Sequence, residues 1–263
     1  MERGCRIASS GQLVDMPRLL FIGGSDSSGG AGVFADLKAC YDLSCEASVA
    51  VTAVTSQSNL RHYESFALPG KTLTGQLLSV SVKDIDAVKI GMLPNLESVE
   101  VVQEFLKNFP RDRIVLDPVF SSSSGGRLST DEGVAALGHC LFPHVGLITP
   151  NLKEAIFLVG KTKLDGQNQE GLASACVGLG VPAALVKGGH FEGEECADLL
   201  ALEGGDIFSF SKKRVKGGSQ VRGTGCRLAS AIACYLAMGQ NLPRAVGNAR
   251  DYLAGYITSQ IQD

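Results

Sequence analysis

The sequence predicts an α/β protein with a central, mostly parallel sheet and helices on both faces. Short apolar runs alternate with segments in which apolar residues recur every three to four positions. This alternation continues through most of the 263 residues, and 44% of them are hydrophobic while only 19% are charged. An α/β fold of about 250 residues often closes as one unit, and no linker or repeat interrupts this chain, so we expect a single domain.

Six apolar runs are predicted as strands, because near-continuous apolar runs are typical of a parallel sheet buried on both faces. They are Arg18–Ile22, Ala47–Val54, Ala87–Ile90, Arg113–Asp117, Gly146–Thr149 and Ala183–Lys187. Six helices are expected between them, at Gly32–Tyr41, Thr72–Val82, Leu96–Asn108, Thr130–Leu141, Leu152–Val159 and Glu170–Leu179. Strands that alternate with helices in this way predict βαβ units.

The last third of the chain has a different pattern. Asp198–Leu202 and Asp206–Phe210 alternate polar and apolar residues around Gly204-Gly205, which predicts an antiparallel hairpin at the sheet edge. Two long helices follow, Thr224–Met238 and Leu242–Ile261, separated by a glycine and a proline. We therefore expect one domain over residues 17–263, preceded by a flexible extension over residues 1–16.

Composition and charge exclude several classes of protein. The net charge is −3 and the longest basic cluster is Lys212–Arg214, so nucleic-acid binding is not expected. No stretch has the length and apolar character of a signal peptide or membrane span, which predicts a cytoplasmic protein without membrane contact. The eight cysteines form no C-x-x-C, and most of them are expected to be small buried hydrophobes. G-x-S-x-G and H-E-x-x-H are absent from the sequence, which argues against hydrolase and zinc chemistry.

The first candidate site is the glycine-rich stretch from Gly23 to Gly32, between a predicted strand and a predicted helix. Such a turn lets backbone N–H groups approach a polar or anionic ligand. It lacks the lysine of a P-loop. It spells Gly30-x-Gly32-x-x-Ala35, but no acidic residue stands about 20 positions further on, so dinucleotide binding is disfavoured. Asp36, in the following helix, is expected to face this loop, or to be an ordinary first-turn carboxylate.

The second candidate site is Arg222-Gly223-Thr224-Gly225-Cys226, at the start of a predicted helix. Small residues there leave backbone N–H groups directed outward, where a phosphoryl group accumulating negative charge could bind. The helix dipole and Arg222 are expected to lower the pKa of the Cys226 thiol. The alternative is structural, with Thr224 as the N-cap and Cys226 as a packed small residue.

The third candidate site combines residues at three predicted strand ends. Asn151 and Glu154 have the spacing of a capping box, which is one sufficient explanation for both. The other explanation places them with Asp117 around a hard cation and its phosphate oxygens. Lys187, followed by two glycines, could contact phosphates as a point charge, and His190 is expected in a loop or lid.

Together these segments resemble one family. GGSDSSGGAGVFADLKA (Gly23–Ala39), VTAVTSQ (Val51–Gln57), KIGML (Lys89–Leu93), VLDPV (Val115–Val119), LITPNLKEA (Leu147–Ala155), VKGGH (Val186–His190) and GTGC (Gly223–Cys226) occur in order between about Arg18 and Tyr252. They are similar to the hydroxymethylpyrimidine and phosphomethylpyrimidine kinases of thiamine biosynthesis, in the ribokinase-like superfamily. The resemblance implies one α/β domain, a homodimer, and ATP with Mg²⁺ as the source of the phosphoryl group.

The resemblance also implies roles for individual residues. The pyrimidine pocket would be lined by Gly24, Ala31, Asp36, Gln57, Met92 and Val119, with Gln57 on the aminopyrimidine edge. Mg²⁺ and phosphates would be handled by Asp117, Asn151 and Glu154, and the ATP phosphates contacted by Lys187. Gly223, Thr224, Gly225 and Cys226 would form the anion hole, with Cys226 where other superfamily members carry an aspartate base.

Three positions depart from the family pattern. Ser58 follows the pocket glutamine, Ser123 replaces a lysine of the loop after D-P-V, and Arg222 replaces a histidine before G-T-G-C. Arg222 could supply, near the phosphates, the positive charge that is lost because position 123 is a serine. Two alternatives remain open: a pyridoxal or pyridoxine kinase of the same superfamily, and a catalytically silent pyrimidine-binding protein.

Overall fold

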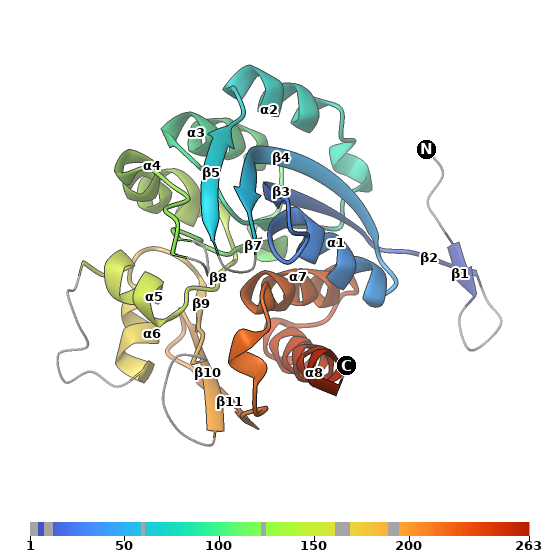
Figure 1. The fold of residues 1–263 in the computed structure, drawn as a ribbon, viewed down its shortest axis with the longest axis vertical. Coiled ribbons are helices and arrows are strands. Elements are labelled where there is room, and N and C mark those ends of the chain that lie inside the picture. The colour runs from blue at the N-terminus through green and yellow to red at the C-terminus, as the bar shows by residue number, and fades with distance from the viewer. Residues whose placement is uncertain are drawn as a thin grey trace.

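The computed structural model describes residues 5–7, 13–58, 61–121, 125–160, 169–188 and 195–262, and its centre is a nine-stranded sheet (Figure 1). The strand order is β11-β10-β9-β8-β7-β6-β3-β4-β5. Six strands form the parallel part: β3 (Arg18–Asp26), β4 (Glu46–Gln57), β6 (Ala87–Ile90), β7 (Ile114–Leu116), β8 (Leu147–Ile148) and β9 (Ala183–Val186). Antiparallel strands complete both edges: β5 (His62–Ala67), β10 (Glu195–Leu202) and β11 (Ile207–Lys213).

Helices cover the two faces of this sheet and define two hydrophobic cores. One face carries α2 (Gly70–Leu78), α3 (Leu96–Leu106), α4 (Asp131–Ala136), α5 (Leu152–Leu158) and α6 (Gln169–Val177). The other carries α1 (Gly32–Asp42), α7 (Thr224–Ala237) and α8 (Leu242–Gln262). Along β3, Leu20 and Ile22 belong to the first core while Leu19 and Phe21 belong to the second, which is the alternation of a strand buried on both sides.

The strand order reverses at β3, and this reversal positions the site. From β3 the chain passes through α1 to β4 on one side, and later returns through α2 to β6 on the other side. These helices lie on opposite faces of the sheet. Ligands of open α/β sheets bind outside the carboxyl ends of the strands next to such a reversal. The segments that follow β3 and β6 are therefore placed to bind a ligand.

The α/β fold with helices on both faces is confirmed, and so is the antiparallel hairpin, formed by β10 and β11. β5 is missing from the expectation, because all six of its residues are exposed or only partly buried and they form no apolar run. β3 continues to Asp26, through residues assigned to the glycine-rich loop, with an irregular register between Gly23 and Ser25.

Within the expected flexible extension, β1 (Cys5–Ile7) pairs with β2 (Leu13–Asp15). The rest of that segment lies outside the described residues, and the boundary at residue 17 stays a prediction. Five cysteines are buried as expected, whereas Cys196 and Cys226 are partly exposed. No helix in the described part of the chain is long and apolar enough to cross a membrane.

Candidate active site

Three neighbouring parallel strands deliver one polar cluster at their carboxyl ends. Asp117 follows β7, Thr149 follows β8 and Lys187 follows β9. Lys187 Nζ lies 2.7 Å from Asp117 Oδ1, and the Thr149 hydroxyl donates a hydrogen bond of 3.1 Å to the same oxygen. The sequence placed Asp117 and Lys187 at strand ends, and the parallel pairing of β7, β8 and β9 brings them into contact.

Asn151 and Glu154 form the predicted capping box at the start of α5, beside this cluster. The Asn151 side chain accepts the Glu154 N–H at 3.0 Å, and Glu154 Oε2 accepts the Asn151 N–H at 2.7 Å. Glu154 is 6% exposed, and burial raises its pKa to about 7 although Lys187 acts in the opposite direction. The capping role uses only one carboxylate oxygen for Asn151, so the structural explanation leaves room for a ligand role.

Charge pairing fixes the ionisation of the Asp117–Lys187 pair. Burial alone would raise the pKa of Asp117, but Lys187 and Lys89, with hydrogen bonds from Lys187 and Thr149, hold it below its usual value. Burial would lower the pKa of Lys187, yet Asp117 and Glu154 keep it raised. The pair therefore stays ionised at neutral pH, with its charges held where phosphate groups could meet them.

Lys89 is a site residue to which the sequence pattern gave no role. It lies in the middle of β6, is 1% exposed, and its Nζ donates to Asp36 Oδ1 at 2.8 Å. Ser230, on α7, donates to the same oxygen at 2.8 Å. A charged residue inside the four-residue buried run AVKI was the available signal, because lysine is rarely buried without a partner.

Asp36 was expected in the pyrimidine pocket, facing the glycine-rich loop. The structure instead buries it completely, as the partner of Lys89 and Ser230. Its contacts are therefore structural in the described chain, and a direct contact with a substrate remains only a prediction.

The segment Gly223–Cys226 forms the expected helix start next to Lys187. Gly223 is the N-cap of α7 with φ 70°, so Thr224 is the first helical residue and its role as N-cap is wrong. A Cβ atom at Gly223 would lie 2.1 Å from the Gly30 carbonyl oxygen, and one at Gly225 would lie 3.3 Å from Lys187 Nζ. Only glycine permits the approach at position 223, where the neighbour is backbone, whereas the contact at Gly225 is with the movable end of Lys187; together they place the turn against both the glycine-rich loop and the lysine.

The expected low pKa of Cys226 is wrong. Burial raises the pKa of its thiol to about 11, and the positive charge of Lys89 only partly opposes this because Asp36 and Asp117 add negative charge nearby. The Arg222 side chain was expected to help lower this pKa, but its guanidinium contacts Ser28, Ser58 and Asp26 instead. Cys226 is therefore a neutral thiol at physiological pH.

Several residues expected in the pyrimidine pocket meet at the strand reversal. A Cβ atom at Gly24 would lie 2.6 Å from Met92 Sδ, and one at Gly32 would lie 2.2 Å from the Gly24 carbonyl oxygen. Ala31 is the N-cap residue of α1. Val119 packs beside Met92, Ala53 and Leu128 in a small third apolar cluster. Gly24, Met92 and Val119 are thus brought together, next to the loop that holds Ala31.

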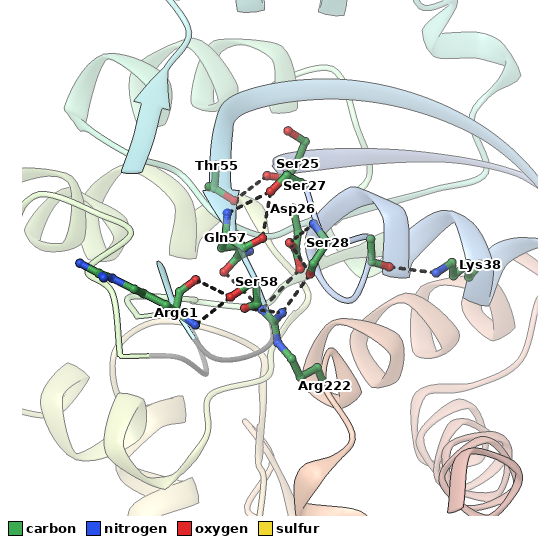
Figure 2. A network of polar contacts seen from close by, with 11 residues as sticks. Ser25, Asp26, Ser27, Ser28, Lys38, Thr55, Gln57, Ser58, Arg61 and Arg222 are labelled. Atoms are coloured by element: carbon green, nitrogen blue, oxygen red, sulfur yellow. Dashed lines mark hydrogen bonds and ion pairs between the residues drawn. The ribbon is translucent and has the colours of Figure 1, made fainter. Parts of the chain in front are cut away.

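Arg222 joins this side of the site rather than the phosphate side. Its guanidinium donates to the Ser28 hydroxyl at 2.9 Å, the Ser58 carbonyl at 3.0 Å and Gln57 Oε1 at 3.2 Å, and pairs with Asp26 Oδ2 at 3.4 Å (Figure 2). The expectation that Arg222 binds phosphate therefore conflicts with the partners it has. Ser123 and His190 lie outside the described residues.

A second network holds the backbone just after Lys187. Asp198, on β10 and 2% exposed, accepts the Gly188 N–H at 2.7 Å and pairs with Arg250 of α8 at 3.1 Å. A Cβ atom at Gly188 would lie 1.8 Å from the Ala197 carbonyl oxygen. These contacts fix the end of β9, and with it the position of Lys187. Asp198 was assigned only to the hairpin by its sequence pattern.

Positive charge beside a glycine-rich helix N-terminus, with two carboxylates nearby, is the arrangement that neutralises a phosphoryl group in transfer. Fold and site together define a ribokinase-like phosphotransferase. The comparisons with known proteins make this assignment specific. The family model described as phosphomethylpyrimidine kinase matches residues 26–262, and the chain belongs to this family.

Relatives and solved structures agree with the family. The hydroxymethylpyrimidine/phosphomethylpyrimidine kinase of Haemophilus influenzae is 36% identical over 248 residues, which cover 93% of this chain and 92% of that protein. The crystal structure of a phosphomethylpyrimidine kinase from Clostridium difficile superposes with a TM-score of 0.78 at 32% identity, over 92% of this chain and 99% of that one. A pyridoxal kinase from Staphylococcus aureus, solved with pyridoxal, reaches 0.83 at 28% identity, over 93% and 89%.

Proposed function

We propose that this protein transfers a phosphoryl group from ATP to the hydroxymethyl group of 4-amino-5-hydroxymethyl-2-methylpyrimidine, and then a second one to the resulting monophosphate. One observation carries the proposal. The Asp117–Lys187 ion pair of 2.7 Å lies beside the glycine turn at the start of α7. The other side of that turn packs against the glycine-rich loop, which lies next to Gly24 and Gln57. A small alcohol bound by the loop would therefore present its hydroxyl to the phosphate-binding residues.

The chain's own residues supply positioning and charge. Lys187 would contact the transferred phosphate, and the backbone N–H groups of residues 223–226 would receive its oxygens as negative charge develops. The Cys226 thiol, with a pKa near 11, is protonated at neutral pH. In that form it would donate a weak hydrogen bond, and only the minor thiolate form would accept the hydroxyl proton as the new O–P bond forms and the bond to the leaving ADP breaks. Phosphoryl transfer depends mainly on positioning and charge neutralisation, so a weak base is sufficient.

The carboxylates fit Mg²⁺. Mg²⁺ is commonly bound by one or two carboxylates together with substrate phosphates and water, and Asp117 and Glu154 provide two carboxylates beside Lys187. No group of three or more potential metal-binding side chains occurs among the described residues. When bound with ATP, Mg²⁺ would neutralise phosphate charge. Asn151, through its capping box, would hold Glu154 in place.

The competing function within the same fold is phosphorylation of pyridoxal or pyridoxine. The specific observation in its favour is the superposition on the staphylococcal pyridoxal kinase, over 93% of this chain. The higher identity to the pyrimidine kinases is the reason to prefer the pyrimidine.

The test is incubation of the protein with each alcohol and Mg-ATP, followed by the mass of the product and the amount of ADP. We expect the pyrimidine alcohol to gain one and then two phosphoryl groups. A product from pyridoxal alone would establish the competing function. ADP formation with neither alcohol, although both bind in a thermal-shift assay, would indicate a silent binding protein.

The proposal includes a homodimer and a reducing compartment such as the cytoplasm. β5 is an edge strand, and Phe66 on it is 61% exposed directly opposite Val54, which is 47% exposed. Large exposed apolar side chains on a sheet edge are typical of an interface between copies. We expect a dimer in analytical ultracentrifugation and a monomer for Phe66→Asp; a monomeric wild type would contradict the proposed dimer.

The described free thiols are compatible with a reducing compartment.

A further inference from the structure

Arg222 links two segments that are far apart in the sequence. It immediately precedes the α7 turn, and its side chain reaches the end of β3 at Asp26 and Ser28 and the end of β4 at Gln57 and Ser58 (Figure 2). Only 13% of the side chain is exposed. Because all these groups accept hydrogen bonds, the two terminal nitrogens of one guanidinium, with four N–H donors in a plane, can serve them together, which an ammonium or an imidazole could not.

The Asp26 carboxylate accounts for the choice of a cation at this position. Asp26 is 1% exposed, and its Oδ1 accepts hydrogen bonds from the Ser28 N–H at 2.8 Å and the Ser28 hydroxyl at 2.7 Å. Its Oδ2 is buried without a hydrogen bond from any described residue, and its charge is balanced by Arg222 at 3.4 Å. A buried carboxylate without a counter-charge would be strongly destabilising, so Arg222 is held in place.

The arginine fixes the orientation of the Gln57 amide. A guanidinium has only donors, so the Gln57 atom that faces it must be the carbonyl oxygen, and the amide nitrogen must lie on the other side. That nitrogen has no hydrogen-bond partner among the described residues, and the Gln57 side chain is partly exposed. The backbone of Gln57 is held separately, by the Ser27 hydroxyl at 2.9 and 3.0 Å. Gln57 thus presents an ordered, unused donor beside an acceptor.

We infer that Arg222 is a specificity-determining positioning residue, which locks the Gln57 amide to select a substrate ring with an acceptor nitrogen beside an amino group. This inference rests on the proposed function. The aminopyrimidine edge has that pattern: its ring nitrogen accepts from the Gln57 amide nitrogen, and its amino group donates to the second lone pair of Oε1. Pyridoxal has no amino group beside its ring nitrogen. The locked amide therefore favours the pyrimidine alcohol over pyridoxal.

The test compares Arg222→Lys with Arg61→Lys, a matched change at a nearby exposed arginine whose guanidinium stacks on Tyr63. Lysine keeps the charge that Asp26 needs but loses the planar fork that holds Gln57. Initial rates are measured for the pyrimidine alcohol and for pyridoxal with Mg-ATP, together with KM for ATP. For Arg222→Lys we expect the ratio of kcat/KM, pyrimidine over pyridoxal, to fall about tenfold, with KM for ATP within about twofold of wild type. Arg61→Lys should change neither.

Gln57→Glu is the second variant, in case Arg222→Lys folds poorly. Glutamate keeps an acceptor for Arg222 and removes the amide donor, so kcat/KM for the pyrimidine should fall at least tenfold. An unchanged substrate ratio in Arg222→Lys, or pyrimidine turnover by Gln57→Glu within twofold of wild type, would overturn the inference. A wild type that phosphorylates pyridoxal but no pyrimidine would overturn the proposed function and this inference together. If the wild type phosphorylates the pyrimidine but Arg222→Lys leaves the substrate ratio unchanged, only the role of Arg222 is overturned.

Discussion

The two ends of the site are built in different ways. At the phosphate end, polar side chains stand at the ends of three adjacent parallel strands, and the Asp117–Lys187 ion pair joins the first and third of them at one edge of the sheet. At the pyrimidine end, glycines bring backbone close, and one arginine from the start of α7 reaches across to β3 and β4. Sheet topology therefore sets the first end, whereas a single long side chain sets much of the second. Substitutions at the first end should therefore impair the use of ATP, and substitutions at the second should impair the use of the pyrimidine.

Asp117→Asn should have the largest effect, because it removes the charge that Lys187, Thr149 and the metal would share. Electrostatic contacts to a transferred group are typically worth about 10²–10³ in turnover, and we expect a loss of about 10³ in kcat. The coupled assay for ADP measures it. Asp131→Asn, at an exposed surface ion pair with Arg127, is the control and should retain full turnover. A loss below about tenfold for Asp117→Asn would place the phosphate end elsewhere.

Glu154→Gln should change the pH dependence of stability in the metal-free protein. The pKa of Glu154 rises from 4.5 to about 7 on folding, so the folded state holds this proton more tightly than the unfolded state does. Wild type therefore loses stability from this group as the pH rises from about 4.5 to 7, whereas glutamine does not titrate. We expect the variant to gain up to about 3 kcal/mol relative to wild type across that range.

Urea unfolding of both proteins at pH 5 and pH 7.5 measures this difference. Glutamine can still accept the Asn151 N–H, so the capping box is preserved in the variant. A stability difference that stays constant between the two pH values would show that Glu154 ionises normally in the folded protein.

Cys226→Ser should lose most of the turnover, about 10- to 100-fold in kcat, while ATP still binds. Only the deprotonated side chain can accept the substrate proton, and a serine hydroxyl loses its own proton less readily than a thiol whose pKa is about 11, so the serine variant has even less of the accepting form. Steady-state kinetics and nucleotide binding by calorimetry separate the two effects. Turnover near that of wild type would remove Cys226 from the catalytic residues and leave the backbone of the α7 turn as the active element.

The sequence predicted the parallel sheet, the helix starts and the capping box, because each is encoded by local periodicity or by residues close in the chain. It also placed Asp117, Lys187 and Gly223–Cys226 at strand ends and a helix start. It did not predict the pKa of Cys226, since burial and the charges of Asp36 and Asp117 come from distant segments. The partners of Arg222 were missed for the same reason, because Asp26 and Gln57 lie far away in sequence.

The division of the site into two ends is tested most directly by measuring KM for ATP and for the pyrimidine in Lys187→Arg and Arg222→Lys. Both variants keep their charge and change only the shape of the cationic group. We predict that Lys187→Arg raises KM for ATP by about tenfold and leaves KM for the pyrimidine within about twofold, and that Arg222→Lys does the reverse. A rise in both constants in both variants, or a rise in KM for ATP in Arg222→Lys, would contradict the account.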